Sequence, residues 1–338
     1  MVPETTVSGR AWCVVGGAGF IGSHLVAKLL VEDRADRVVV LDNLSSGSRE
    51  LLDRSLSAAG LTDDRVELAE GDCGDPAVAM NALSGVDAVV HLASNPDIAR
   101  AVTEPEIDFH SGTRLTNSVV EAARRLRVGT VVYASGSGVY GDLGDLEIPE
   151  DHGPLRPVST YGASKLAGEA LVCAYSHMFG MRGRAFRFAN VVGPGQTHGV
   201  GYDFLAKLAA DPTQLPILGD GRQSKCYIAV DDVLDAIMAV LDARPGAGGS
   251  TEPYQIYNVS TDDALSVDDI AVAACVAAGL DPAEVEFSHT GGRGGWNGDV
   301  PVVRLDTNRI RALGWVPRRT SAQAMHWALA SMSVASES

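Results

Sequence analysis

Tyr161 and Lys165 are the two side chains of this sequence whose types and spacing best suit acid–base chemistry. They stand four residues apart, and side chains at this spacing lie on the same face of a helix. A free phenol has a pKa of about 10, and a positive charge nearby favours its ionised form. A phenolate placed in this way can take a proton from a substrate hydroxyl group near neutral pH. The pair therefore predicts an acid–base centre at the start of a helix.

A run of glycines near the beginning of the chain is typical of a dinucleotide site. Gly16, Gly19 and Gly22 stand between an apolar segment that suits a strand and one that suits a helix. One such glycine allows a tight turn, one lets the backbone approach a pyrophosphate, and one lets the helix pack closely on the sheet. The helix start, with Phe20 and Ile21, then presents unpaired N–H groups and a positive dipole end to the phosphates.

The acidic residue after the second expected strand indicates which dinucleotide is bound. Asp42 stands where a carboxylate should bind the hydroxyl groups of the adenosine ribose. The residues that follow it carry no cation for a 2′-phosphate until Arg49, so the sequence favours NAD over NADP, and the cation of a bound nicotinamide would further favour the Tyr161 phenolate. Asp72 and Cys73 are expected at the adenine edge. The remaining residues expected to line the cofactor are Asn43, Ser46, Gly47, Leu92, Ala93 and Ser94.

These sites require parallel strands that bring them to one edge of a sheet, and the sequence predicts such strands. Short apolar runs favour strands at Ala11–Val15, Val38–Leu41, Val66–Ala69, Ala88–Leu92 and Thr130–Ala134. Helical patterns include Ile21–Val31, Arg114–Leu126 and Tyr161–Phe179. The alternation of strands and helices predicts an α/β fold, a Rossmann-type doubly wound parallel sheet with right-handed crossovers.

This alternation changes after Asn190, which predicts a smaller discontinuous α/β domain for the substrate. We expect helices at Phe204–Ala209, Asp231–Ala243 and Val267–Ala278, the last with Ser266 as its N-cap, and strands at Leu215–Leu218, Cys226–Val230 and Tyr254–Val259. The dinucleotide-binding domain is expected to comprise residues 1–189 and about 227–262. The substrate domain is expected to comprise about 190–226 and 263–338.

Composition and charge restrict the class of partner. The net charge of −16 opposes binding to nucleic acid or to an anionic membrane, and no apolar run reaches the ~18 residues of a membrane span. Five cysteines without a CxxC pair are typical of reduced thiols in the cytoplasm. The eight histidines show no metal-ligand spacing. We therefore expect a cytoplasmic protein with a small-molecule substrate and no metal.

The chain resembles the extended short-chain dehydrogenase/reductase family, in its NAD-dependent sugar-nucleotide epimerase/dehydratase branch, and is most like UDP-hexose 4-epimerases. The resemblance spans nearly the whole chain in order. It is carried by Gly16–Gly22, Leu41–Leu44, His91–Ala93, Val139–Gly141, Tyr161–Lys165, Arg187–Asn190, Gly193-Pro194, Gly219–Gly221, Gln223, Leu305–Thr307 and Leu313–Pro317.

The resemblance implies roles for residues that the sequence patterns leave unassigned. Lys165 should also hold the nicotinamide ribose, and Asn190 should meet the nucleotide diphosphate. Lys225 stands where the family usually has arginine, and a lysine lacks the bidentate fork of a guanidinium group. Trp296 takes the place of a second phosphate-binding arginine, for which Arg293 is the expected substitute. The family also implies a homodimer through the helices at 114–126 and 161–179, and substrate contacts from Pro216, Leu218, Tyr227 and Asp299.

The segment before Val139 and Tyr140 bears on the reaction. Members that dehydrate carry Thr-Asp-Glu there and those that decarboxylate glucuronate usually carry Glu, whereas this chain has Ser135-Gly136-Ser137-Gly138. The resemblance then favours NAD-dependent 4-epimerization of a UDP-sugar of the glucose, glucuronate or N-acetylglucosamine class. Glucuronate decarboxylation, stand-alone C4 reduction and a non-catalytic NAD sensor stay open. Gly136 replaces the family's assisting Ser or Thr, and Ser137 or Ser135 is the expected substitute hydroxyl.

Overall fold

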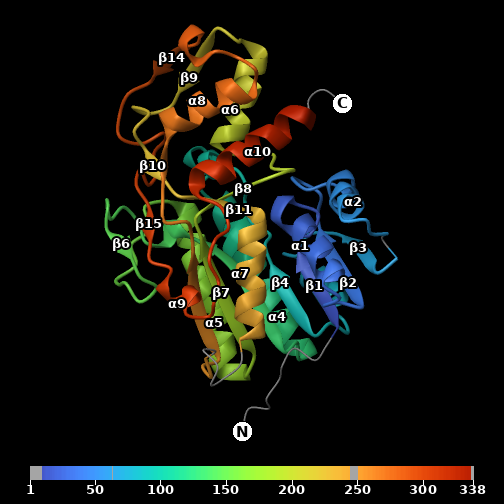
Figure 1. Cartoon of the computed structure of the whole chain (residues 1–338). Coiled ribbons are helices and arrows are strands. Elements are labelled where there is room, and N and C mark those ends of the chain that lie inside the picture. Colours follow the sequence, from blue (N-terminus) through green and yellow to red (C-terminus); the bar gives the residue numbers. More distant parts are fainter. Residues whose placement is uncertain (1–9, 63, 244–249, 336–338) are drawn as a thin grey trace.

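A sheet of seven parallel strands forms the centre of the computed structural model, which describes residues 10–62, 64–243 and 250–335 (Figure 1). The strands lie in the order β12-β7-β5-β4-β1-β2-β3. Their bounds are β1 Ala11–Val15, β2 Arg37–Asp42, β3 Val66–Glu70, β4 Ala88–His91, β5 Thr130–Gly136, β7 Arg182–Phe188 and β12 Tyr254–Val259. The order reverses between β1 and β4, and sheets of this kind bind ligands beyond the carboxyl ends of the strands at such a point. The predicted doubly wound α/β fold is confirmed.

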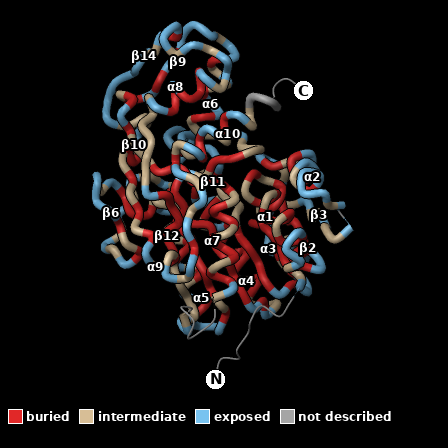
Figure 2. Tube along the Cα trace, viewed as in Figure 1, coloured by how far each residue is buried: buried red, intermediate tan, exposed pale blue. Residues whose placement is uncertain are grey.

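Helices cover both faces of this sheet, and the strands are accordingly apolar on both sides (Figures 1 and 2). Trp12 and Val14 of β1 belong to a core shared with α1, α2 and α7. Cys13 and Val15 belong to a second core shared with α3, α4 and α5. The bounds of these helices are α1 Phe20–Val31, α2 Arg49–Ala58, α3 Pro76–Ala82, α4 Leu115–Leu126, α5 Thr160–Phe179 and α7 Val230–Asp242.

A third core lies beyond the sheet, at the top of Figure 1, among helices α6, α8 and α10. Helix α8 begins with the predicted N-cap Ser266, which forms a capping box with Asp269. The elements of this region are β8 Asn190–Val192, α6 Val200–Ala210, β9 Gln214–Ile217, β10 Ser224–Lys225, β11 Tyr227–Ala229, β13 Leu265–Ser266, α8 Val267–Ala277, η4 Pro282–Glu284, β14 Glu286–His289 and α10 Ser321–Ala335. The exact division into two domains stays a prediction.

Short elements complete the chain. They are η1 Ile98–Val102, the π-helical turn η2 Phe109–Arg114, η3 Ser137–Val139, β6 Glu147–Ile148, β15 Arg304–Leu305 and α9 Asn308–Arg311. The sequence patterns predict most of the long elements to within a few residues, but they give no range for β7, α2, α3 or α10. Within the described ranges, none of the helices has both the length and the apolar character that crossing a membrane requires.

Candidate active site

Tyr161 and Lys165 lie together in the first turns of α5. Ser159 caps this helix by accepting a hydrogen bond from the Gly162 main-chain N–H at 3.1 Å, which fixes where the helix begins. The Lys165 Nζ lies 5.5 Å from the centre of the Tyr161 ring. It donates a 2.8 Å hydrogen bond to the Ala134 main-chain oxygen of β5. The helix geometry expected from the sequence is therefore present, and it directs both side chains toward the carboxyl end of β5.

Burial dominates the protonation of this pair. It raises the pKa of Tyr161 to about 12, against a hydrogen bond with Ser94 that lowers this pKa, and the charge of Asp108 raises it further. Burial lowers the pKa of Lys165 to about 8, whereas the charges of Asp108 and Glu169 raise it. The protein groups alone thus leave Tyr161 as a neutral phenol at pH 7. Its ionisation requires the additional positive charge that the sequence argument assigned to a nicotinamide cation.

A buried carboxylate joins the loop after β4 to the start of α5. Asp108 is 1% exposed. Its Oδ1 accepts a hydrogen bond from Asn95 Nδ2 at 2.9 Å, and its Oδ2 accepts one from Thr160 Oγ1 at 2.7 Å. Asn95 also closes a turn with Asp97 through hydrogen bonds of 2.9 and 3.0 Å. The residues next to Ser94 and Tyr161 are therefore held by one side chain.

The segment at the end of β5 differs from the expectation of a free hydroxyl at Ser135. Ser135 Oγ donates a 2.6 Å hydrogen bond to Glu169, which also accepts bonds of 2.9 and 2.7 Å from Arg187. No described atom lies within 4 Å of the place where a Cβ at Gly136 would stand. Ser137 begins the short turn η3 and is half-buried. The catalytic roles of Ser135 and Ser137 stay predictions.

The glycine loop between β1 and α1 is shaped for a ligand at one glycine and for packing at the others. A Cβ at Gly22 would lie 2.1 Å from the Gly16 main-chain oxygen, and Gly16 itself has φ +81° with its Cβ position 2.8 Å from the Ala93 nitrogen. A Cβ at Gly19 would lie no nearer than 3.4 Å to its closest neighbour. Protein packing therefore does not require glycine at 19, and close approach of a ligand is a reason that remains.

The other predicted cofactor residues surround this loop. Helix α1 starts at Phe20 without a side-chain cap, which leaves its first N–H groups for an anion. Asp42 fastens the loop, because its Oδ2 accepts from the Ala18 N–H and its Oδ1 from the Leu44 N–H, both at 2.9 Å. Gly47 packs against Ala18, and Asp72 accepts a 2.7 Å bond from the Gly74 N–H. Ile21, Leu92, Ala93 and Ser94 are half-buried, Cys73 is buried, and Asn43 and Ser46 are exposed. This donor set and glycine cradle fit a dinucleotide.

The residues that the sequence analysis expected to bind the substrate lie between β8 and β11 and in the loop after β14. Lys225 Nζ forms a 2.6 Å ion pair with Asp299, which also accepts a hydrogen bond from the Gly295 N–H. Asn190 is exposed and donates to the Cys226 main-chain oxygen. The side chain of Arg293, the expected substitute cation, is 74% exposed. It lies 3.8 Å from Asp142 and not beside the ion pair of Lys225 and Asp299. Pro216 and Leu218 are exposed, and Tyr227 is buried.

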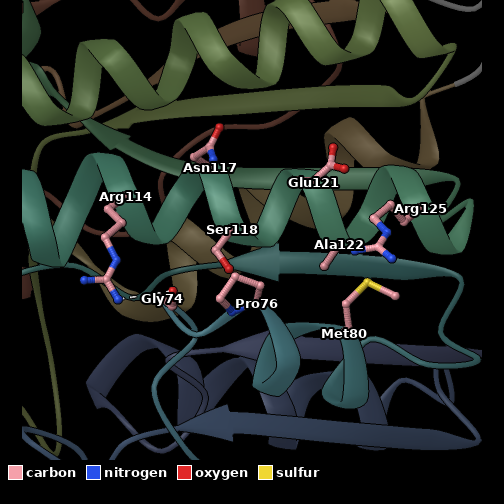
Figure 3. Close-up of a pocket in the computed structure, with 9 residues that line it drawn as sticks. All are labelled: Gly74, Pro76, Met80, Arg114, Asn117, Ser118, Glu121, Ala122 and Arg125. Atoms are coloured by element: carbon pink, nitrogen blue, oxygen red, sulfur yellow. Dashed lines mark hydrogen bonds between the residues drawn. The ribbon is translucent and has the colours of Figure 1, made fainter.

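Two hollows flank these sites. One of about 210 Å³ lies at the start of α5 and is lined by Ala101, Val102, Val158, Ser159, Thr160, Trp296 and Asn297. The other, of about 290 Å³, lies between α3 and α4 (Figure 3), where Arg114 donates to the Gly74 main-chain oxygen. Arg114 at the end of η2, Ser118 of α4 and Met80 of α3 point into it, and neither Tyr161 nor Lys165 lines it. Neither residue of the acid–base pair lines the smaller hollow either, but its lining includes Ser159 and Thr160, which directly precede Tyr161.

Sequence patterns missed three polar residues of this site. Asp108, Asn95 and Glu169 are buried charged or amide groups that no local motif marks. Their partners lie 13 to 52 residues away for Asp108 and 18 to 34 residues away for Glu169, so only the folded chain brings them together. Ser94 was expected to contact the cofactor, and its hydrogen bond with Tyr161 was not expected.

Comparisons with known proteins agree with this geometry. A model of the NAD-dependent epimerase/dehydratase family matches residues 12–260. A UDP-glucose 4-epimerase of Mycolicibacterium smegmatis is 34% identical over 320 residues, which cover 92% of this chain and 95% of that protein. A dTDP-glucose 4,6-dehydratase of Streptomyces griseus is 33% identical over 308 residues, which cover 90% of this chain and 88% of that protein. The crystal structure of a UDP-galactose 4-epimerase has a TM-score of 0.82 at 37% identity and covers 96% of this chain and 99% of its own.

Proposed function

The chain belongs to the NAD-dependent epimerase/dehydratase family, and from this premise we propose that it is a 4-epimerase of UDP-linked sugars. One observation carries the proposal. Tyr161 and Lys165 form an acid–base pair at the cofactor edge of the sheet, while the neighbouring segment 135–138 holds only serine and glycine. A single acid–base centre suffices for reversible oxidation at one carbon, which is the whole chemistry of a 4-epimerase.

Tyr161 performs the proton transfers in this proposal. Bound NAD supplies the acceptor for the hydride of sugar C4 and the donor that returns it. Tyr161, as the phenolate, takes the proton of the 4-hydroxyl group as the C4–H bond breaks, which gives a 4-keto sugar. After the sugar has turned over, Tyr161 returns the proton to the 4-oxygen as the opposite face of C4 is reduced. Lys165 holds the nicotinamide ribose and contributes positive charge beside the phenol.

The end of β5 argues against elimination of water. A 4,6-dehydratase needs a further acid and base beside the C4 centre, because water leaves from neighbouring carbons. Gly136 and Gly138 carry no side chain, and the hydroxyl group of Ser135 is bound to Glu169. Identity does not separate the two reactions, since the epimerase and dehydratase relatives are 34% and 33% identical to this chain. The side chains at 135–138 therefore support epimerization in this proposal.

The substrate is proposed to bind by its diphosphate near Lys225 and by its sugar near Tyr161. Lys225 has the charge for a phosphate group, and Asn190 lies on the neighbouring strand β8. The open space at Gly136 favours sugars with a larger substituent, such as a carboxylate or an N-acetyl group. UDP-glucose, UDP-glucuronate and UDP-N-acetylglucosamine are the three candidates that follow.

The test is incubation of the NAD-loaded protein with each of these three UDP-sugars, with NMR identification of products. The expected product is the C4 epimer, without net consumption of NAD, and Tyr161→Phe is expected to abolish its formation. A 4-keto-6-deoxy sugar would show that the protein is a dehydratase. Unchanged turnover in Tyr161→Phe would contradict the mechanism.

Decarboxylation of UDP-glucuronate is the second candidate, and the open space at Gly136 favours it to the extent that a C6 carboxylate fits there. The same oxidation at C4, in which Tyr161 takes the hydroxyl proton and bound NAD would accept the hydride, would precede loss of the carboxyl group. Release of carbon dioxide from UDP-glucuronate would establish this reaction in place of epimerization. A protein that binds NAD but converts none of the three sugars would instead be a non-catalytic sensor.

The chain is further proposed to form a cytoplasmic homodimer in which α4 and α5 of two subunits pack together. These helices lie side by side on one face of the sheet. Sedimentation equilibrium should give twice the mass of one chain, and a monomer at all concentrations would contradict the proposal.

A further inference from the structure

Asp108 is a buried carboxylate that has no cationic partner. It is 1% exposed, and each of its oxygens accepts a hydrogen bond, one from Asn95 and the other from Thr160. The carboxylates of three other buried residues, Glu150, Glu169 and Asp232, each lie 2.7 to 3.6 Å from an arginine. Within the described ranges, Asp108 takes part in hydrogen bonds but in no ion pair. A buried charge without a cation lowers the stability of a fold, so a role in the site is a reason for its presence.

The segment that begins at Asp108 contacts α5 at two residues, one before and one after Tyr161. Asp108 Oδ2 accepts the 2.7 Å hydrogen bond of Thr160, the first residue of α5 and the neighbour of Tyr161. Farther along η2, a Cβ at Gly112 would lie 2.7 Å from Ser164 Oγ, so the main chain of η2 packs directly on the helix. Thr160 and Ser164 are four residues apart and share a face of α5. The segment 108–112 therefore fixes the turn of α5 from which Tyr161 projects.

Three other titratable groups lie around the acid–base pair: His91 of β4, Tyr133 of β5 and Glu169 of α5. Burial leaves the histidine and the tyrosine neutral, because it lowers the pKa of His91 to about 3 and raises the pKa of Tyr133. Glu169 is compensated by its ion pair with Arg187. Asp108 is therefore the negative charge near the pair that no described cation compensates.

We propose that Asp108 is a positioning residue of the acid–base pair, which sets the place of the first turn of α5 through Thr160 and thereby the place of the Tyr161 phenol. The proposal rests on the proposed acid–base role of Tyr161. A negative charge is favourable beside the first turn of a helix, which offsets part of the cost of burying the carboxylate. A reacting group displaced by about 1 Å can lose about a hundredfold in rate, so a contact that fixes this turn matters for catalysis.

Variants at Thr160 test the contact by turnover of the NAD-loaded protein. Thr160 is exposed, so a valine at this position is expected to fold. Thr160→Val removes the hydroxyl donor and should lower kcat roughly tenfold, with little change in KM, whereas Thr160→Ser keeps the donor and should retain most of the activity. Thr62→Val is the matched control, because the exposed Thr62 also donates to a carboxylate, that of Asp64, at 3.1 Å. A wild-type kcat in Thr160→Val would overturn the proposal.

A second measurement does not require turnover. The NMR signal of the Tyr161 ring carbon that bears oxygen, in tyrosine-labelled NAD-loaded protein, is assigned by its loss in Tyr161→Phe. Below the titration midpoint, its shift reports the surroundings of the neutral phenol. Thr160→Val should change this shift, and Thr62→Val should not. A changed shift without turnover of any UDP-sugar would keep Asp108 as a positioning residue and reject the proposed function instead, and an unchanged shift would refute the contact.

The same signal tests whether Asp108 lies close enough to act on the phenol. Burial raises the pKa of Tyr161, and the charge of Asp108 raises it further. Asp108→Asn removes that charge and should move the titration midpoint of Tyr161 to lower pH. Asp232→Asn, which removes a buried charge on α7, is the control and should leave the midpoint in place. An unmoved midpoint in Asp108→Asn, or an equal movement in the two variants, would overturn the proposal.

Discussion

The Nζ of Lys165 donates a 2.8 Å hydrogen bond to the main-chain oxygen of Ala134, at a place where the lysine is only 4% exposed. Burial lowers the pKa of this ammonium group to about 8, although the charges of Asp108 and Glu169 raise it. The folded protein therefore holds a proton on Lys165 less tightly than the unfolded chain does. A residue needed for the chemistry is expected to reduce the stability of the fold.

Lys165→Met should abolish turnover and yet stabilise the protein. The shift from 10.5 to about 8 corresponds to about 3 kcal/mol, since one pKa unit is about 1.4 kcal/mol. Loss of the bond to Ala134 offsets part of this, so we expect the free energy of unfolding to rise by about 1 to 3 kcal/mol at pH 7. Urea denaturation of both proteins measures the difference.

The pH dependence of this gain has a definite sign. Between about 8 and 10.5 the unfolded wild-type chain binds more protons at Lys165 than the folded one, so the stability of the wild type rises with pH there. The advantage of Lys165→Met should be full below pH 8 and should shrink as pH rises toward 10.5. Lys207→Met is the control, because Lys207 also donates to a main-chain oxygen, but it is only half-buried and its bond is exposed to solvent. A constant advantage across this range would contradict the burial argument.

The glycine loop allows packing to be separated from ligand binding. Gly22→Ala would place a Cβ 2.1 Å from the Gly16 oxygen, and we expect a loss of roughly 3 kcal/mol in the free energy of unfolding. Gly19→Ala has room within the protein, so its stability should stay within about 0.5 kcal/mol of the wild type. Its affinity for NAD should nevertheless fall at least tenfold, as measured by calorimetric titration. If Gly19→Ala binds NAD normally, the pyrophosphate does not approach this glycine.

The ion pair of Glu169 and Arg187 is expected to serve the fold. Their side chains are 4% and 2% exposed, and removal of one partner leaves a buried charge uncompensated. Glu169→Gln should lower the free energy of unfolding by roughly 3 kcal/mol. Glu121→Gln breaks the exposed pair with Arg124 and should cost at most about 0.5 kcal/mol. Equal losses in the two variants, measured by thermal and urea unfolding, would show that burial does not set the cost.

The central sheet could be predicted because its strands follow simple patterns. β1 and β12 occupy the ranges expected from their apolar runs, and the glycine loop lies between β1 and α1 as expected. β7 was missed because its sequence Arg-Gly-Arg-Ala-Phe-Arg-Phe contains three arginines, a composition atypical of a buried strand. Arg187 is tolerated there through Glu169, and Arg184 through main-chain oxygens of Gly183 and Pro253. Such partners cannot be known before the fold is.

The same limit applies to the candidate site. Tyr161, Lys165 and the glycines could be identified because local spacing alone gives them a role. Asp108 could not, since its contacts with Asn95 and Thr160 join two segments that are distant in sequence. A bulky side chain at position 136 would have indicated a specific contact with the substrate. The open space that the structure shows at Gly136 indicates no specific contact.

The ion pair of Lys225 and Asp299 leads to a prediction about substrate binding. A diphosphate near Lys225 must compete with a carboxylate 2.6 Å from its Nζ, and Asp299 is 7% exposed. Lys225→Met should raise KM for the UDP-sugar roughly tenfold with little change in kcat, because the lost contact is the same in the ground and transition states. Lys207→Met removes an equal charge elsewhere and controls for the general field.

Asp299→Asn makes this argument more specific. It keeps the size of the side chain but removes the competing charge, so the NAD-loaded variant should bind UDP more tightly than the wild type. The affinity of this variant for UDP should also fall more steeply with added salt. Lys225 then has no paired carboxylate, so its attraction to the diphosphate is a larger share of the binding energy, and dissolved ions screen that attraction. Calorimetric titration with UDP at two ionic strengths measures both effects. Weaker binding of UDP in Asp299→Asn would show that this carboxylate contacts the nucleotide directly, and equal binding in Lys225→Met would remove the lysine from the diphosphate site.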